Sequence, residues 1–71
     1  MKVYILTEVY DPESDEIIKV FDSEKKARDY VHRNYKITKY DDSSDKRHIR
    51  NFVVYYWTET NEVLIQAFEI E

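Results

Sequence analysis

The side chains with the most evident chemistry form a basic run, Lys46-Arg47-His48-Ile49-Arg50, with aromatic residues on both sides of it. Lysine and arginine can hold phosphate groups, and aromatic rings such as Trp57 can stack on bases. The chain nevertheless has a net charge of −4, and Asp41, Asp42 and Asp45 dilute the local positive field. The run therefore predicts an anionic ligand, either a nucleotide or a nucleic acid, only as the alternative function.

The residues that could support catalysis or metal binding do not form a recognisable pattern. His32 and His48 fit no short-range ligand spacing, and both lie among basic residues that would oppose a cation. The chain has no cysteine, and no serine stands in a glycine-flanked nucleophile elbow, because the chain has no glycine. We therefore expect no metal site, no cofactor and no enzymatic activity.

The most apolar segment is the run Phe-Val-Val-Tyr-Tyr-Trp at residues 52–57. It predicts a strand, and Tyr55 and Trp57 should share one face of it because they are two residues apart. Tyrosine and tryptophan concentrate binding energy at protein interfaces. We therefore expect Tyr55 and Trp57, together with Tyr4 and Tyr10 of the first strand, to bind a protein partner or a second copy of the chain.

The elements that position these residues follow from apolar periodicity and from polar breaks. Ser23 or Asp22 can cap a helix, and Ala27, Tyr30 and Val31 share one stripe of it. The predicted fold is α+β with the order ββαββ: a four-stranded antiparallel sheet with one helix packed on one face. The predicted strands cover residues 2–10, 16–21, 51–58 and 62–70, and the helix covers residues 24–34.

Two further expectations concern the connections between these elements. Because the chain lacks glycine, Asn34, Asn51 and Asn61 are expected to take the left-handed turn positions. Residues 36–50 lose all periodicity, which predicts a loop that is mobile in the free protein and orders on binding. Strand order and the sheet face that the helix covers stay open.

The size of the chain limits how much of the sheet can be covered. Its 71 residues predict a single domain, 1–71, with a small core. A helix of this length spans only about 15 Å, so it cannot cover the whole sheet, although both faces carry apolar residues. An exposed apolar face of this kind usually marks an interface.

The segments KVYILTE and EIIKVFDSEKKARDYV resemble a group of small proteins found mainly in bacteriophages and prophages. In that group a strand ending in Val-Phe leads through Asp or Ser and a following Ser into a helix with Lys and Ala, as Val20 to Ala27 do here. The likeness covers roughly the first half of the chain. Lys19 stands where the group often has glycine, and the segment from Lys46 onward has no counterpart.

The resemblance implies a phage or mobile-element origin and a small accessory protein, which would bind and block a host defence or replication protein. The start of the chain lacks the apolar region of a signal peptide, and no span is long enough to cross a bilayer. We therefore expect no membrane association and a location in the cytoplasm of a bacterial host.

Overall fold

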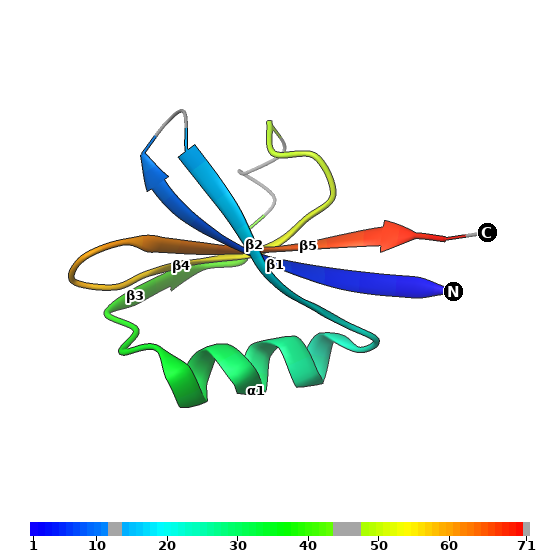
Figure 1. Cartoon of the computed structure of the whole chain (residues 1–71), viewed down its shortest axis with the longest axis horizontal. Coiled ribbons are helices and arrows are strands. Elements are labelled where there is room, and N and C mark those ends of the chain that lie inside the picture. The colour runs from blue at the N-terminus through cyan, green and yellow to red at the C-terminus, as the bar shows by residue number, and fades with distance from the viewer. Residues whose placement is uncertain (12–13, 44–47, 71) are drawn as a thin grey trace.

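A computed structural model describes residues 1–11, 14–43 and 48–70 of the chain. The fold is α+β, with one helix and a five-stranded antiparallel sheet. Figure 1 shows the helix α1 along one side of the sheet and residues 48–51 on the other side. The elements are β1 (Lys2–Asp11), β2 (Ser14–Phe21), α1 (Glu24–Asn34), β3 (Lys39–Asp41), β4 (Phe52–Trp57) and β5 (Glu62–Glu69).

The strands lie in the order β2-β1-β5-β4-β3, so the first and last strands of the chain are neighbours inside the sheet. Their pairing is regular from Lys2 opposite Glu69 to Val9 opposite Glu62. The hairpins β1–β2 and β4–β5 extend the sheet on either side of this central pair, and β3 adds the edge next to β4. The first and last described residues therefore lie together at one end of the sheet (Figure 1).

The fifth strand corrects the predicted order ββαββ with four strands. The strand β3 lies inside the segment 36–50, where an irregular loop is predicted, and it pairs with β4 from Lys39 opposite Trp57 to Asp41 opposite Tyr55. The prediction fails because a three-residue edge strand is held by backbone hydrogen bonds, which leave no apolar periodicity in the sequence. Residues 44–47 lie outside the described part of the chain, and the predicted mobility stays a prediction.

The core lies between α1 and the sheet. The helix contributes Ala27 and Val31, both fully buried, as the predicted stripe requires. Burying a valine side chain contributes about 1.5–3 kcal/mol relative to exposure, and burying the single methyl group of alanine contributes about 0.8 kcal/mol. The sheet residues of this core are Leu6, Val54, Tyr56, Val63 and Ile65.

The helix begins as predicted but ends differently. The Ser23 side chain accepts a hydrogen bond from the Lys26 N–H at 3.1 Å, which confirms the N-cap. The helix does not end on a left-handed asparagine, because the capping residue Tyr35 is extended with φ −129°. Instead, the Asn34 side-chain amide donates to the Tyr30 carbonyl at 2.9 Å and satisfies one of the last carbonyls of the helix.

Of the other two predicted left-handed asparagines, one is confirmed. Among the described residues, only Asn51 has a positive φ, 57°, and it immediately precedes β4. The prediction for Asn61 is wrong, because one side-chain and one backbone hydrogen bond close the β4–β5 turn without a left-handed residue. The Thr58 hydroxyl accepts the Asn61 N–H at 3.0 Å, and the Asn61 carbonyl accepts the Thr58 N–H at 2.9 Å.

Candidate functional site

The sheet has one face toward α1 and one face turned away from it, which we call the open face. Directly opposed residues of antiparallel strands share a face, and Tyr55 opposes Leu64 while Trp57 opposes Glu62. Tyr56, between them, packs in the core beneath the helix. Tyr55 and Trp57 therefore lie together on the open face, as predicted.

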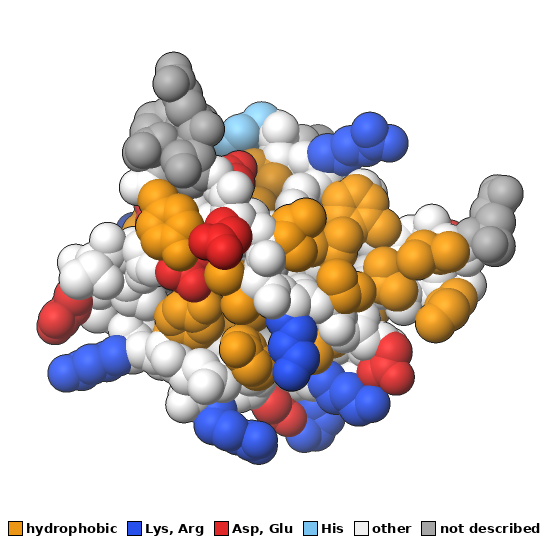
Figure 2. All heavy atoms as spheres, viewed as in Figure 1, with side chains coloured by type: hydrophobic (Ala, Val, Ile, Leu, Met, Phe, Trp, Pro, Cys, Tyr) orange, Lys and Arg blue, Asp and Glu red, His pale blue; other side chains and the backbone are white. Residues whose placement is uncertain are grey.

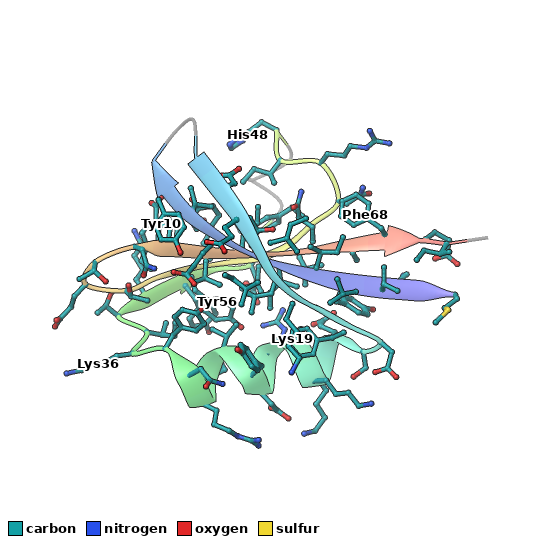
Figure 3. All side chains as sticks on the ribbon, in the orientation of Figure 1. Tyr10, Lys19, Lys36, His48, Tyr56 and Phe68 are labelled. Carbon is teal, nitrogen blue, oxygen red and sulfur yellow. The ribbon has the colours of Figure 1, made fainter. Side chains whose placement is uncertain are left out.

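The strand pairing extends this face across the sheet. Five residues, one from each strand, oppose one another in turn, and three of them are apolar or aromatic. Val3 and Phe68 form another opposed pair on the same face, and Figure 3 shows Phe68 on the side of the sheet away from α1. The five opposed residues, in order from β3 to β2, are Asp41, Tyr55, Leu64, Thr7 and Ile17.

The two aromatic rings are fixed by polar groups on either side of them. Their centroids are 4.8 Å apart with an interplanar angle of 40°. The Lys39 Nζ lies 4.9 Å from the Trp57 ring centroid, and the Tyr55 hydroxyl donates to the Glu62 carboxylate at 3.0 Å. Burial, helped by that carboxylate, raises the pKa of Tyr55 to about 12. The half-buried pair is thus an ordered aromatic platform with a cation and a carboxylate at its edges.

The other two predicted partner-binding residues lie elsewhere. Tyr4 opposes Phe21 and packs against the core cluster, so it is on the helix side of the sheet. Tyr10 lies near the end of β1, where its hydroxyl donates to Glu16 at 3.3 Å and the residue is 52% exposed. The structure therefore brings Tyr55 and Trp57 together but does not bring Tyr4 or Tyr10 to them.

Two apolar residues of β2 belong to the open face and were not predicted as part of a site. Ile17 opposes Thr7 and Val20 opposes Ile5, and their exposed fractions are 64% and 53%. They share a face although they are three residues apart, because the register shifts by one residue at Ile18. Plain alternation would have placed them on opposite faces.

A second polar cluster is centred on Glu8 of β1. Its carboxylate accepts hydrogen bonds from the Tyr35 hydroxyl at 2.8 Å and from the Asn61 side-chain amide at 2.6 Å. Burial and the adjacent carboxylate raise the pKa of Tyr35. These bonds tie the end of α1 and the β4–β5 turn to β1, and both carboxylate oxygens of Glu8 are engaged.

The basic run of the alternative prediction is only partly within the described residues. Lys46 and Arg47 lie outside them, while His48 and Arg50 are exposed. The Arg50 carbonyl accepts a hydrogen bond from the Gln66 side chain at 2.8 Å, which holds this part of the chain against β5. The proposed use of these residues for an anionic ligand stays a prediction.

The two histidines lie on opposite sides of the sheet. His32 is on α1 and packs edge-on against Tyr56 with ring centroids 5.4 Å apart, whereas Figure 3 shows His48 on the other side. Within residues 1–11, 14–43 and 48–70, no group of three acidic, histidine or cysteine side chains is arranged to hold a metal ion. In the same ranges no helix has the length and apolar character needed to cross a membrane.

Comparison with known proteins identifies the family but no function. No curated protein and no solved structure gives a significant match to the chain. One family model, described as a domain of unknown function, matches residues 1–71. The chain therefore belongs to the family of domains of unknown function DUF7336.

Proposed function

We propose that this chain is a non-enzymatic protein-binding module that docks a partner protein on its open face, centred on Tyr55 and Trp57. The observation that carries the proposal is the aromatic platform, two half-buried rings 4.8 Å apart on the sheet face that α1 does not cover. Tryptophan and tyrosine are the residue types most often found at the energetic centre of protein interfaces.

The surroundings of the platform support this reading. The apolar residues Ile17 and Val20 extend the open face to the β2 edge and are more than half exposed. Leu64 and Thr7, which lie between Tyr55 and Ile17 on this face, are buried, so the exposed apolar side chains are concentrated at the β2 edge. Exposed apolar surface on a small protein commonly marks a contact with another protein. Figure 2 shows hydrophobic side chains in a band across the sheet region, with Lys and Arg side chains gathered mainly around the helix below it.

The platform is also held in place before a partner arrives. Glu62 binds the Tyr55 hydroxyl, and Lys39 lies over the Trp57 ring. Side chains that are ordered in the free protein lose less conformational entropy on binding. The order of the two rings therefore lowers the entropic cost of binding.

The expected partner is a host protein, which the module would block by occupying its surface. This part of the proposal depends on the resemblance to phage and prophage proteins over the first half of the chain. A second copy of the chain is the competing occupant of the open face. Inhibition by occupancy predicts one-to-one stoichiometry per site and no turnover.

Site-directed photo-cross-linking tests which face is used. A photoreactive phenylalanine analogue replaces Ile17 on the open face in one variant and Lys25 on α1 in a control variant. Lys25 is a suitable control because its side chain is 85% exposed and belongs to the opposite side of the molecule. We expect cross-linked complexes from position 17 and none from position 25. Cross-linking in bacterial extract would detect a host partner, and cross-linking in the purified protein would detect a dimer.

The purified complex then tests the platform itself. We expect Trp57→Ala to weaken association at least tenfold, which corresponds to about 1.4 kcal/mol, with little change in melting temperature. The double variant His32→Ala with His48→Ala should bind as the wild type does. Cross-linking from position 25 alone, unchanged affinity for Trp57→Ala, or catalytic turnover abolished by the histidine changes would each contradict the proposal.

A further inference from the structure

A groove of about 630 Å³ runs between the edge strand β2 and the helix α1. One wall is formed by residues 19–22 at the end of β2. The other wall is formed by Lys26, Asp29, Tyr30 and Arg33, which lie along one stripe of α1 because they are spaced by three or four residues.

The strand wall of this groove includes an unpaired sheet edge. β2 is the outermost strand on its side, and only its inner edge pairs with β1. In an antiparallel strand, the N–H and C=O groups of alternate residues point to opposite edges. Some backbone groups of Lys19, Val20 and Phe21 therefore point outward. Val20 lines the groove although its side chain is on the open face, so the groove reaches this outer edge.

Two aromatic rings, with the Lys19 ammonium group close to both, lie on the helix side of the groove. The Phe21 and Tyr30 rings have centroids 5.4 Å apart and are tilted by 54°. The Lys19 Nζ lies 5.1 Å from the Tyr30 centroid and 5.6 Å from that of Phe21. Figure 3 shows Lys19 directed from the sheet toward the helix. The surface offers an apolar contact next to a positive charge.

Only some of the charged side chains that line the groove form ion pairs with other side chains of the protein. The carboxylate of Asp22 binds Lys26 at 2.9 Å, and that of Asp29 binds Lys25 at 2.7 Å. Each lysine holds the pKa of its partner below the usual range. Among the described residues, neither Lys19 nor Arg33 makes an ion pair. Two cations are therefore available in a protein whose net charge is −4.

We infer that this groove binds an extended, acidic segment of a partner protein, which adds to β2 as a further strand. Strand addition to an exposed sheet edge obtains affinity from main-chain hydrogen bonds and specificity from alternate side chains. Lys19 and Phe21 both point to the helix side of β2, so the residues opposite them in an added strand are two apart. The recognised pattern is an acidic residue and an apolar residue separated by one residue, with a further acid near Arg33.

This site shares Val20 with the open face, and separate variants distinguish the two sites. Lys19→Glu with Arg33→Glu reverses both available charges in the groove. Lys36→Glu with Lys2→Glu is the matched control, because both lysines are exposed and neither lines the groove. Trp57→Ala removes the centre of the open face and leaves the groove unaltered.

Selection from a randomised octapeptide library displayed on phage supplies the probe. We expect the wild-type protein to enrich peptides with the acid-x-apolar pattern, and a synthetic selected peptide to shift the amide resonances of residues 19–21 in the wild-type spectrum. Its affinity should fall at least tenfold for Lys19→Glu with Arg33→Glu. The control pair and Trp57→Ala should each leave it within about twofold.

Circular dichroism checks that each variant is folded, since Lys19 packs over two rings. The amide shifts in the wild-type protein locate the peptide independently of any variant. The inference is overturned if no peptide is enriched, if basic or uncharged peptides are enriched, or if shifts fall outside the groove. Loss of peptide affinity in Trp57→Ala would also overturn it, because it would place the peptide on the open face.

Discussion

Removing the hydroxyl group of Tyr56 is predicted to stabilise the protein, whereas most core substitutions destabilise it. Tyr56 is 1% exposed, and its hydroxyl has no hydrogen-bond partner among the described residues. The Arg28 guanidinium lies close by and donates through Nε to Glu24 at 2.8 Å. Burial raises the pKa of Tyr56 and Arg28 opposes that rise, but no Arg28 nitrogen is in hydrogen-bonding geometry with the hydroxyl. Leaving a buried polar group unsatisfied costs about 1–3 kcal/mol. Tyr56→Phe keeps the ring in the core and removes this cost.

We therefore expect Tyr56→Phe to stabilise the protein by about 1 kcal/mol, at the lower end of that range because the nearby Arg28 cation attracts the hydroxyl oxygen. In a domain of this size, 1 kcal/mol corresponds to about 4–8 °C in melting temperature. Thermal and urea unfolding followed by circular dichroism measure both quantities. The slope of the urea transition should not change, since the same surface is exposed on unfolding.

The matched control is Tyr35→Phe, which removes a hydroxyl that does have a partner. That hydroxyl donates to the Glu8 carboxylate at 2.8 Å, and the bond is partly buried. Its loss should destabilise the protein by about 1.5 kcal/mol, the lower end of the range for hydrogen bonds to charged groups, because the bond is only partly buried. The two changes delete the same atom and should shift stability in opposite directions. A destabilised Tyr56→Phe, equal to Tyr35→Phe, would show that the buried hydroxyl is satisfied in solution and refute the reasoning.

Three further predictions concern local features. Ser23→Ala should destabilise the protein by about 1 kcal/mol through loss of the bond to the Lys26 N–H, measured by urea unfolding, whereas Ser23→Asp should retain stability. The raised pKa of Tyr55, about 12 against an ordinary 10.0, means that the unfolded chain ionises first. Stability should therefore fall as pH rises from about 10 to 12, and less steeply in Tyr55→Phe, with absorbance at 295 nm reporting the ionisation. The Thr38 amide, which donates to the Trp57 carbonyl at 2.8 Å, should be protected in hydrogen exchange, and exchange as fast as in the unfolded chain would argue against β3.

The features that local sequence determines were predicted well. The helix bounds Glu24 and Asn34 are the predicted ones, because a polar cap and an apolar stripe act over only a few residues. The shared face of Tyr55 and Trp57 also follows from spacing within one strand. The helix also forms the ion pairs Glu24–Arg28 and Lys25–Asp29 between residues four apart, a spacing that brings two side chains together on any helix.

The features that depend on pairing between strands were missed. β3 has no apolar pattern of its own, and it forms because its backbone can pair with the edge of β4. Tyr4 points away from Trp57 because the register between β1, β5 and β4 decides which residues share a face. The groove between β2 and α1 could not be predicted either, since it joins Lys19 to Arg33 through tertiary packing alone.

The position of β1 beside β5 has a consequence for how the chain acquires its structure. The pairing of β1 with β5 runs from Lys2 opposite Glu69 to Val9 opposite Glu62. The sheet therefore cannot form completely until β5 has been synthesised. Contacts between residues so distant in sequence slow folding, because loop closure must precede the stabilising contacts. During synthesis on a ribosome, Leu6, Ala27 and Val31 emerge well before Val63 and Ile65, with which they form the core. The apolar side chains of the first half therefore stay exposed to solvent until the second half has been synthesised. Folding should then occur late and in a single cooperative step.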